Sequence, residues 1–205
     1  MTTSLRLLLV RHGETVANAA GILDSRPPGQ PLNDQGHRQA AELAQRLAGE
    51  PVVAVYASLA TRAQQTATPV AARHGLPVQV LSGVHEVFIG DLEGRHHPED
   101  HQTLHRLYRA WHAGDLDQTR PGGESAKQVL DRYLADVAAV RSAHSAGTAV
   151  LVSHGAATRL AIVALASNVD GSFAGPRLLP NAGTVLLEAD GGGWRCLRWD
   201  DIELD

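Results

Sequence analysis

Short apolar runs alternate with segments of helical periodicity along most of the chain. The runs cover residues 5–10, 52–57, 78–81 and 148–153. Runs of this kind are typical of strands in a parallel sheet, which helices cover on both faces. The spacing of apolar residues predicts helices over 33–48, 59–74, 126–144 and 156–166. This alternation predicts an α/β fold, a three-layer α/β/α sandwich with a mostly parallel central sheet.

Two further segments change this simple picture. Residues 184–188 and 194–199 are expected to pair as a hairpin across the turn 191–193, which gives the sheet an antiparallel edge. Residues 92–124 interrupt the alternation and contain one helical stretch, 98–113. We interpret this segment as a small helical cap inserted over the edge of the sheet, within a single domain that spans residues 1–205.

Composition narrows the class of protein. The chain has 22 acidic and 18 basic residues, a formal net charge of -4, so no basic excess suggests nucleic acid or an anionic membrane as a partner. The amino-terminal apolar run, residues 7–10, is too short for a signal peptide or a membrane span. A single cysteine, Cys196, excludes an internal disulfide framework, and we expect it in the core. We therefore expect a cytoplasmic protein; its oligomeric state stays open, with a homodimer as one option.

Polar residues follow the ends of four predicted strands. In open α/β sheets, ligands bind beyond these carboxyl ends. The residues there are Arg11, His12, Gly13 and Asn18 after the first strand, Arg62 after the second, Glu86 after the third, and His154 with Gly155 after 148–153. Two arginines, two histidines and one carboxylate are thus expected to converge.

This set of side chains suits a phosphoryl group. Guanidinium groups bind phosphate oxygens in bidentate fashion. One neutral imidazole could attack phosphorus while a second, protonated one stabilises the equatorial oxygens. A carboxyl group would protonate the leaving oxygen and then deprotonate water. Each residue alone could be an ordinary polar residue at a strand end, but four such coincidences favour a phosphoryl-transfer site.

The motifs that carry these residues resemble a known family. Residues 9–15, LVRHGET, resemble the signature of the histidine phosphatase superfamily, in its phosphoglycerate mutase-like branch. The resemblance continues in the family's order and spans nearly the whole chain. The further matching positions are Asn18, 31–33, Gly36, 58–66, Glu86, Gly90, Glu93, Gly94, 121–125 and 152–155.

The resemblance assigns a role to each residue. It implies that His12 is the nucleophile, phosphorylated in the intermediate, and that Glu86 is the proton donor and acceptor. It implies that Arg11, Arg62 and His154 complete the catalytic phosphate pocket. Asn18 would add a phosphate contact, and the backbone at Gly155 would come close to the anion. The resemblance implies that the protein needs no metal and no nucleotide cofactor, and we expect no cofactor for the hydrolysis.

The expected function is metal-independent hydrolysis of a small phosphorylated metabolite through a phosphohistidine. A cofactor-dependent phosphoglycerate mutase is the alternative within the family. A non-catalytic module that binds a phosphorylated ligand is the alternative from another class. Degenerate members of that kind normally lose a core residue, and this chain keeps all five, which favours catalysis.

Two segments near the site have no assigned role. The loop of residues 24–30 is expected to border the substrate and could add Arg26, although we favour an exposed loop arginine. His97, His101 and His105 recur every four residues, a spacing that a metal-dependent hydrolase would use. The segment lacks an HExxH motif and is rich in charged residues, so we interpret it as a solvated helix face.

Overall fold

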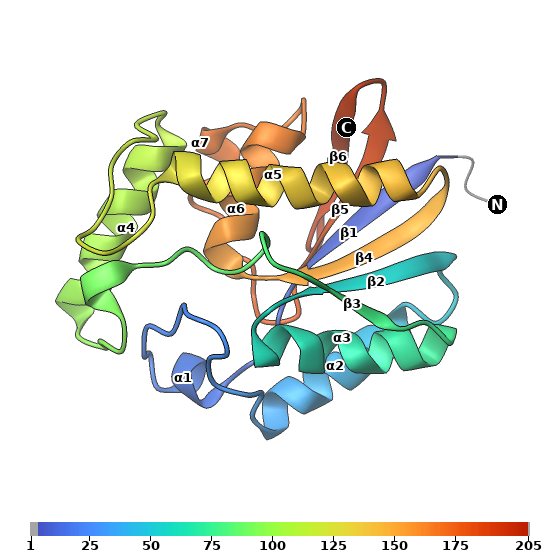
Figure 1. Cartoon of the computed structure of the whole chain (residues 1–205), viewed down its shortest axis with the longest axis horizontal. Coiled ribbons are helices and arrows are strands. Elements are labelled where there is room, and N and C mark those ends of the chain that lie inside the picture. The colour runs from blue at the N-terminus through green and yellow to red at the C-terminus, as the bar shows by residue number, and fades with distance from the viewer. Residues whose placement is uncertain (1–3, 205) are drawn as a thin grey trace.

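A seven-stranded sheet runs through the middle of the protein (Figure 1). The computed structural model describes residues 4–204. The strand order is β3-β2-β4-β1-β5-β6-β7. Strands β1 to β4 pair in parallel, and β5 to β7 form an antiparallel edge, as the sequence predicted. The strands are β1 (Leu5–Arg11), β2 (Val52–Ser58), β3 (Val78–Leu81), β4 (Gly147–Ser153), β5 (Thr184–Asp190), β6 (Gly193–Trp199) and β7 (Ile202–Glu203).

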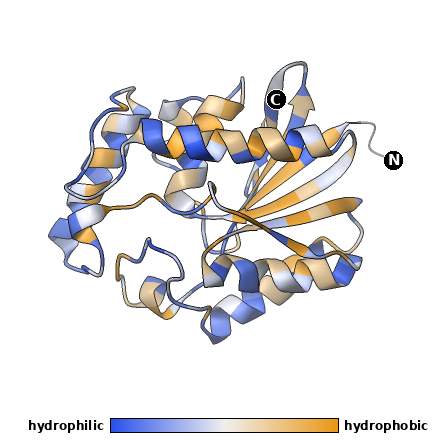
Figure 2. Cartoon of the chain, in the orientation of Figure 1, coloured by the Kyte–Doolittle hydropathy of each residue, from blue (hydrophilic) through white to orange (hydrophobic). Residues whose placement is uncertain are grey.

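Helices cover both faces of this sheet, and β1 shows why. Leu7 and Leu9 pack into the core on one face, whereas Leu8 and Val10 pack into the core on the other. All four are almost fully buried, as expected for a central strand. Helices α2 (Asp34–Arg46) and α3 (Thr61–His74) lie on one side, and α5 (Ala126–Ala143) and α6 (Gly155–Leu165) lie on the other (Figure 1). The predicted three-layer sandwich is confirmed, and Figure 2 shows its strands as mainly hydrophobic.

The segment predicted to be a cap lies beyond the carboxyl ends of the parallel strands. It begins near the 3-10 helix η1 (Gly90–Leu92) and contains α4 (Pro98–His112). A bridge between Ile89 and Gly123 brings its two ends together. Helix α4 contacts α6 and α7 (Gly171–Ala174). It therefore stands over the edge of the sheet where the strands end (Figure 1).

Short elements were not predicted. Helix α1 (Val16–Ala19) has four residues, too few to show a helical period. It is fixed by a capping box, in which Thr15 Oγ1 accepts from the backbone N–H of Asn18 and Asn18 Oδ1 accepts from the backbone N–H of Thr15. Helix α7 is equally short and is capped by Asp170. Strand β7 has two residues.

Two remaining predictions concern burial. Cys196 is a free, buried thiol in the core, as predicted, and burial raises its pKa to about 11. Within residues 4–204, no helix combines the length and the apolar character that crossing a bilayer requires.

Candidate active site

The parallel strands end around a cavity of about 230 Å³. It is lined by six of the residues that the sequence singled out, namely Arg11, His12, Asn18, Arg62, Glu86 and Gly155. His154 is fully buried and lies directly behind the cavity lining, in contact with His12 and Arg62. The structure thus brings all seven residues together, although they come from four separate parts of the chain.

His12 is held in one tautomer. Its Nδ1 lies 2.7 Å from the carbonyl oxygen of Gly13, which can only accept, so Nδ1 carries the proton. The other ring nitrogen, Nε2, accepts from Nε of Arg62 at 3.1 Å. Burial lowers the pKa of His12 well below its usual value, and the charges of Arg62 and Arg11 lower it further. His12 is therefore neutral near pH 7, and in the ligand-free protein the lone pair of Nε2 is occupied by the hydrogen bond from Arg62.

The backbone around His12 leaves no room for a side chain at Gly13. A Cβ there would lie 2.7 Å from the carbonyl oxygen of Gly36. The Gly13 N–H donates to Thr66 Oγ1 at 2.9 Å, and that hydroxyl donates to the carbonyl of Arg62 at 2.7 Å. This chain of hydrogen bonds ties the nucleophile's loop to the first turns of α3.

The two arginines are fixed by different partners. Arg62 is buried and pairs with Asp24, whose Oδ2 lies 3.2 Å from Nη1 and whose carbonyl accepts from Nη2 at 3.1 Å. Arg11 donates through Nη1 to the carbonyl of Leu179 at 2.6 Å. A Cβ at Gly155 would lie 3.4 Å from the Arg11 side chain, so the helix start and this guanidinium are in close contact. Both arginines are thereby oriented before a ligand enters.

His154 is neutral in the ligand-free protein. Nη2 of Arg62 lies 3.4 Å from its Nδ1 and can only donate, so the proton is on Nε2, which bonds Ser58 Oγ at 2.7 Å. Burial, followed by the charge of Arg62, holds the pKa of His154 well below its usual value. The protonated second imidazole that the sequence analysis expected therefore requires the charge of a bound anion.

Glu86 sits at the start of α6. Its Oε1 accepts from the N–H groups of Val87 and Ala157, both at 2.9 Å, and its Oε2 accepts from Ala156 at 3.1 Å. Ala156 and Ala157 belong to the first turn of α6, where backbone N–H groups lack helical partners and can donate to a side-chain oxygen. Glu86 is therefore fixed on one side of the cavity by the helix that begins after His154.

Asn18 is oriented by a second asparagine that the sequence analysis missed. Asn181 Nδ2 donates to Asn18 Oδ1 and to the carbonyl of His12, both at 3.1 Å. Asn18 Oδ1 also accepts from the Thr15 N–H at 3.3 Å. With its oxygen engaged, Asn18 can offer its amide N–H groups to a ligand.

Comparison with known proteins decides the family. A model of the histidine phosphatase superfamily (branch 1) matches residues 7–202. The chain belongs to the histidine phosphatase superfamily. The family that the motifs predicted is thus confirmed.

Individual relatives of this superfamily member are named as phosphatases. It is 31% identical to a metal-independent phosphoserine phosphatase of Arabidopsis thaliana, over 96% of this chain and 81% of that protein. It is 37% identical to the adenosylcobalamin/alpha-ribazole phosphatase of Escherichia coli over 64% of this chain and 66% of that protein. A mycobacterial glucosyl-3-phosphoglycerate phosphatase solved with VO3 superimposes with a TM-score of 0.82 at 26% identity, over 95% of this chain and 98% of that one.

Further residues that line the cavity of this superfamily member were not singled out from the sequence. Among them are Leu104 and Tyr108 of α4 and Arg159 of α6. Arg159 did leave a signal, because it is the one charged residue in the apolar α6 sequence GAATRLAIVAL; it is only 6% exposed. Leu104 and Tyr108 lie in the segment 92–124 that was expected to cap the sheet, but which of its side chains face the cavity depends on how α4 packs over the strand ends.

The loop of residues 24–30 borders the cavity through Asp24 and Ser25. Arg26 is exposed instead; its guanidinium lies 4.8 Å from the centre of the Phe88 ring and 3.4 Å from the carbonyl of Gly122. The favoured interpretation of Arg26 as an exposed loop arginine is confirmed.

The histidine-rich segment behaves as a helix face. His97 and His105 are exposed, and His101 is half-buried, with Nε2 2.8 Å from the carbonyl oxygen of Gly21. Among residues 4–204, no group of three or more His, Cys, Asp or Glu side chains is arranged to hold a metal ion.

Proposed function

We propose that this protein hydrolyses small phosphomonoesters without a metal ion, through a phosphohistidine on His12. One observation carries the proposal: His12, which lines the cavity beside two arginines, is neutral, and its Nδ1 proton is fixed on the Gly13 carbonyl. Its Nε2 accepts from Arg62 in the ligand-free protein, and a bound phosphoryl group would take over that guanidinium and release the Nε2 lone pair for attack. The relatives named as phosphatases support the same reaction class.

In the first step His12 Nε2 attacks phosphorus. The guanidinium groups of Arg11 and Arg62 and the amide of Asn18 bind the phosphoryl oxygens, and the Gly155 backbone lies against them. The bond from phosphorus to Nε2 forms while the bond to the ester oxygen breaks. Glu86 donates a proton to that oxygen, which leaves as an alcohol.

In the second step water replaces the histidine. Glu86, now a carboxylate, accepts a proton from the water as its oxygen bonds to phosphorus. The bond from phosphorus to Nε2 breaks, and inorganic phosphate leaves. His12 returns to its starting tautomer because Nδ1 keeps its proton on the Gly13 carbonyl throughout. His154 supports both steps by taking up a proton when the anion is bound and stabilising the charge on the equatorial oxygens.

A trapping experiment tests the nucleophile. Rapid quenching with a labelled phosphomonoester should leave an acid-labile, base-stable label on the peptide that contains His12. The variant His12→Ala should lose both label and turnover, whereas His96→Ala, an exposed histidine of the neighbouring segment, should keep both. A label on serine, or on another histidine, would overturn the mechanism.

A second assay separates hydrolysis from the two alternatives. Phosphate release and interconversion of 3- and 2-phosphoglycerate are measured on one preparation, the latter with 2,3-bisphosphoglycerate present and enolase as the coupling enzyme. A mutase must keep water from its phosphoenzyme while the substrate reorients. We expect phosphate release to dominate. Mutase turnover about tenfold higher than phosphate release would identify a mutase, and ligand binding without turnover would identify a binding module.

We also infer that the protein acts in the cytoplasm, where its one thiol, on the buried Cys196, would stay reduced. Cell fractionation would test this location.

A further inference from the structure

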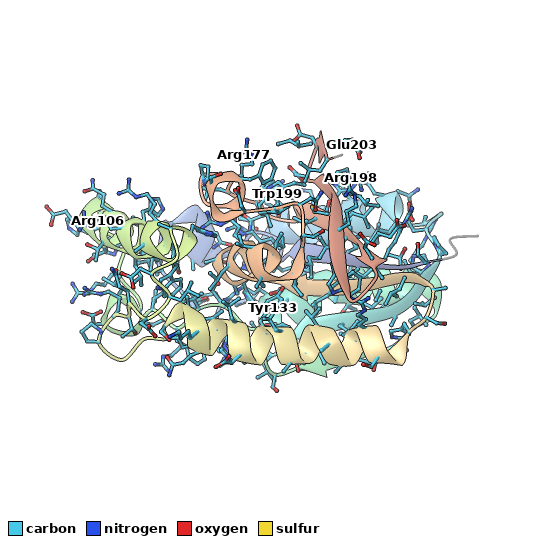
Figure 3. All side chains as sticks on the ribbon, turned by 90° about the horizontal axis from the view of Figure 1, so that it is seen from above. Arg106, Tyr133, Arg177, Arg198, Trp199 and Glu203 are labelled. Carbon is cyan, nitrogen blue, oxygen red and sulfur yellow. The ribbon has the colours of Figure 1, made fainter. Side chains whose placement is uncertain are left out.

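A second, larger cavity adjoins the catalytic one. It has a volume of about 750 Å³ and lies between α4 and the segment around α7. In Figure 3, α4 carries the labelled Arg106 at one end of the molecule. Tyr108, Arg159 and Leu178 line both cavities. The two cavities therefore meet at these three side chains.

The lining of this second cavity is basic. Five nitrogen bases face it, and no carboxylate lines it among the described residues; the five are His105, Arg106, Arg109, His112 and Arg159. Composition does not explain this, because the chain has more acidic than basic residues. Within residues 4–204, none of the three arginines forms an ion pair, whereas Arg6, Arg62, Arg95, Arg120, Arg132 and Arg198 each do. Arg106 and Arg109 thus bring positive charge that no ion pair of the described residues balances. At Arg159, burial lowers the pKa, and the charge of Glu86, which acts from a longer distance than an ion pair, raises it in part.

Arg159 is fixed at the junction of the two cavities. Its Nε donates to the carbonyl of Gly155, which lines the catalytic cavity, at 3.3 Å. Its Nη1 donates to the carbonyl of Gly175, which lines the second cavity, at 2.8 Å. A buried guanidinium held at two points is pre-organised to bind an anion.

Together with burial, the charge of Arg159 lowers the pKa of two histidines that line the same cavity. Burial and the charge of Arg159 together lower the pKa of His112 to about 4, and the same two causes lead the lowering at His105. Both imidazoles are therefore neutral near pH 7, so the net charge on this cavity is that of its arginines.

We propose that the second cavity is a subsite for a second anionic group, a carboxylate or a phosphate, on the same substrate whose phosphoester lies at His12. The inference rests on the proposed function and narrows it to phosphomonoesters with an anionic tail. The tail's charge meets Arg106, Arg109 and Arg159, and its carbon atoms lie against Pro176 and Leu178.

Matched substrates test the subsite. Alkyl phosphates of increasing length are compared with a terminal hydroxyl, a terminal carboxylate or a terminal phosphate, and p-nitrophenyl phosphate serves as the tail-free reference. At the best length we expect kcat/KM for one anionic tail to exceed that for the hydroxyl tail by about tenfold or more, the effect of a charge-assisted contact. The better of the two anionic arms identifies the tail as carboxylate or phosphate.

Charge-neutral variants locate the effect. In the double variant Arg106→Gln, Arg109→Gln this preference should fall to nearly one. Both side chains are exposed on α4, so the fold should survive, which a thermal melt checks. The matched control Arg73→Gln, an exposed arginine of α3, should keep the full preference.

The outcomes separate the two proposals. If p-nitrophenyl phosphate is hydrolysed but no anionic tail is preferred at any length, the subsite is refuted and the proposed hydrolysis stands. A preference that survives unchanged in the double variant also refutes the subsite. If no phosphomonoester is hydrolysed at all, the proposed function itself fails.

Discussion

Replacing Glu86 with glutamine removes the proposed acid, and the structure shows what else it changes. The amide oxygen can keep the two bonds that Oε1 accepts from Val87 and Ala157. The amide nitrogen then takes the place of Oε2, 3.1 Å from the Ala156 N–H, so two donors face each other. An unsatisfied donor costs about 1–3 kcal/mol when buried, and these two groups are half-buried at the cavity, so we expect a cost of about 1 kcal/mol. At about 2–4 °C per kcal/mol for a domain of this size, the Tm should fall by about 2–4 °C.

The effect on rate should depend on the leaving group. An alkyl alcohol leaves only with a proton, so Glu86→Gln should lower kcat/KM, which reports the steps up to departure of the alcohol, by about 10²–10⁴-fold for alkyl phosphates. The p-nitrophenolate ion leaves without a proton, so the loss in kcat/KM for p-nitrophenyl phosphate should stay below about tenfold. Both rates are measured on one preparation, at a temperature well below its Tm.

A second carboxylate provides the control for lost stability. Glu124 accepts from the Phe88 N–H at 2.9 Å and pairs with Arg132 at 2.8 Å, as a half-buried residue outside the set that lines the catalytic cavity. Glu124→Gln should lower Tm but change the two rates by the same factor. Equal losses on both substrates in Glu86→Gln as well would mean that Glu86 does not transfer the proton.

Three further outcomes are expected. Sulfate, a dianion that does not titrate near neutral pH, should bind with uptake of about one proton, because it raises the low pKa of His154. At pH values between the pKa of His154 in the free protein and its pKa in the sulfate complex, the affinity for sulfate should fall about tenfold per unit rise in pH. Calorimetry in two buffers of different ionisation enthalpy measures the proton, and uptake that persists in His154→Asn would contradict the assignment. Millimolar EDTA should leave hydrolysis unchanged, and a loss that zinc restores would favour a metal-dependent hydrolase. Gly36→Ala should unfold at a lower temperature, since its Cβ would lie 2.1 Å from the Glu14 carbonyl oxygen, whereas Gly49→Ala, with nothing within 4 Å, should not.

The sheet could be predicted from the sequence because its central strands are buried on both faces. In β1 and β4 most residues are apolar because both faces of these strands are buried. An apolar run such as 148–153 can therefore be recognised as a strand from its own residues alone. The four residues of α1 carry no such period. Their structure depends on the hydrogen bonds between Thr15 and Asn18, which the sequence alone does not reveal.

The features of the site also fall into those that the sequence predicts and those that only the folded structure reveals. His12, Arg62, Glu86 and His154 lie near strand ends, and the topology of a parallel sheet gathers strand ends at one edge, so their convergence followed from the pattern. Asp24 could not be predicted as the partner of Arg62, because an ion pair across 38 residues depends on how the loop of residues 24–30 folds back over α3. The state of His154 was equally hidden, since its pKa depends on complete burial beside Arg62.

The position of β1 in the sheet has a consequence for local unfolding. It lies between β4 and β5, and beyond its end the His12 N–H still donates to the Ser153 carbonyl at 3.0 Å. Amide protons of such a central strand exchange with solvent only when the whole domain unfolds, whereas exposed loops exchange through local opening at little cost. Native-state hydrogen exchange should therefore find β1, and the His12 N–H just beyond its end, among the most protected amides. The imidazole that performs the chemistry thus keeps its place through every local opening of the surrounding loops.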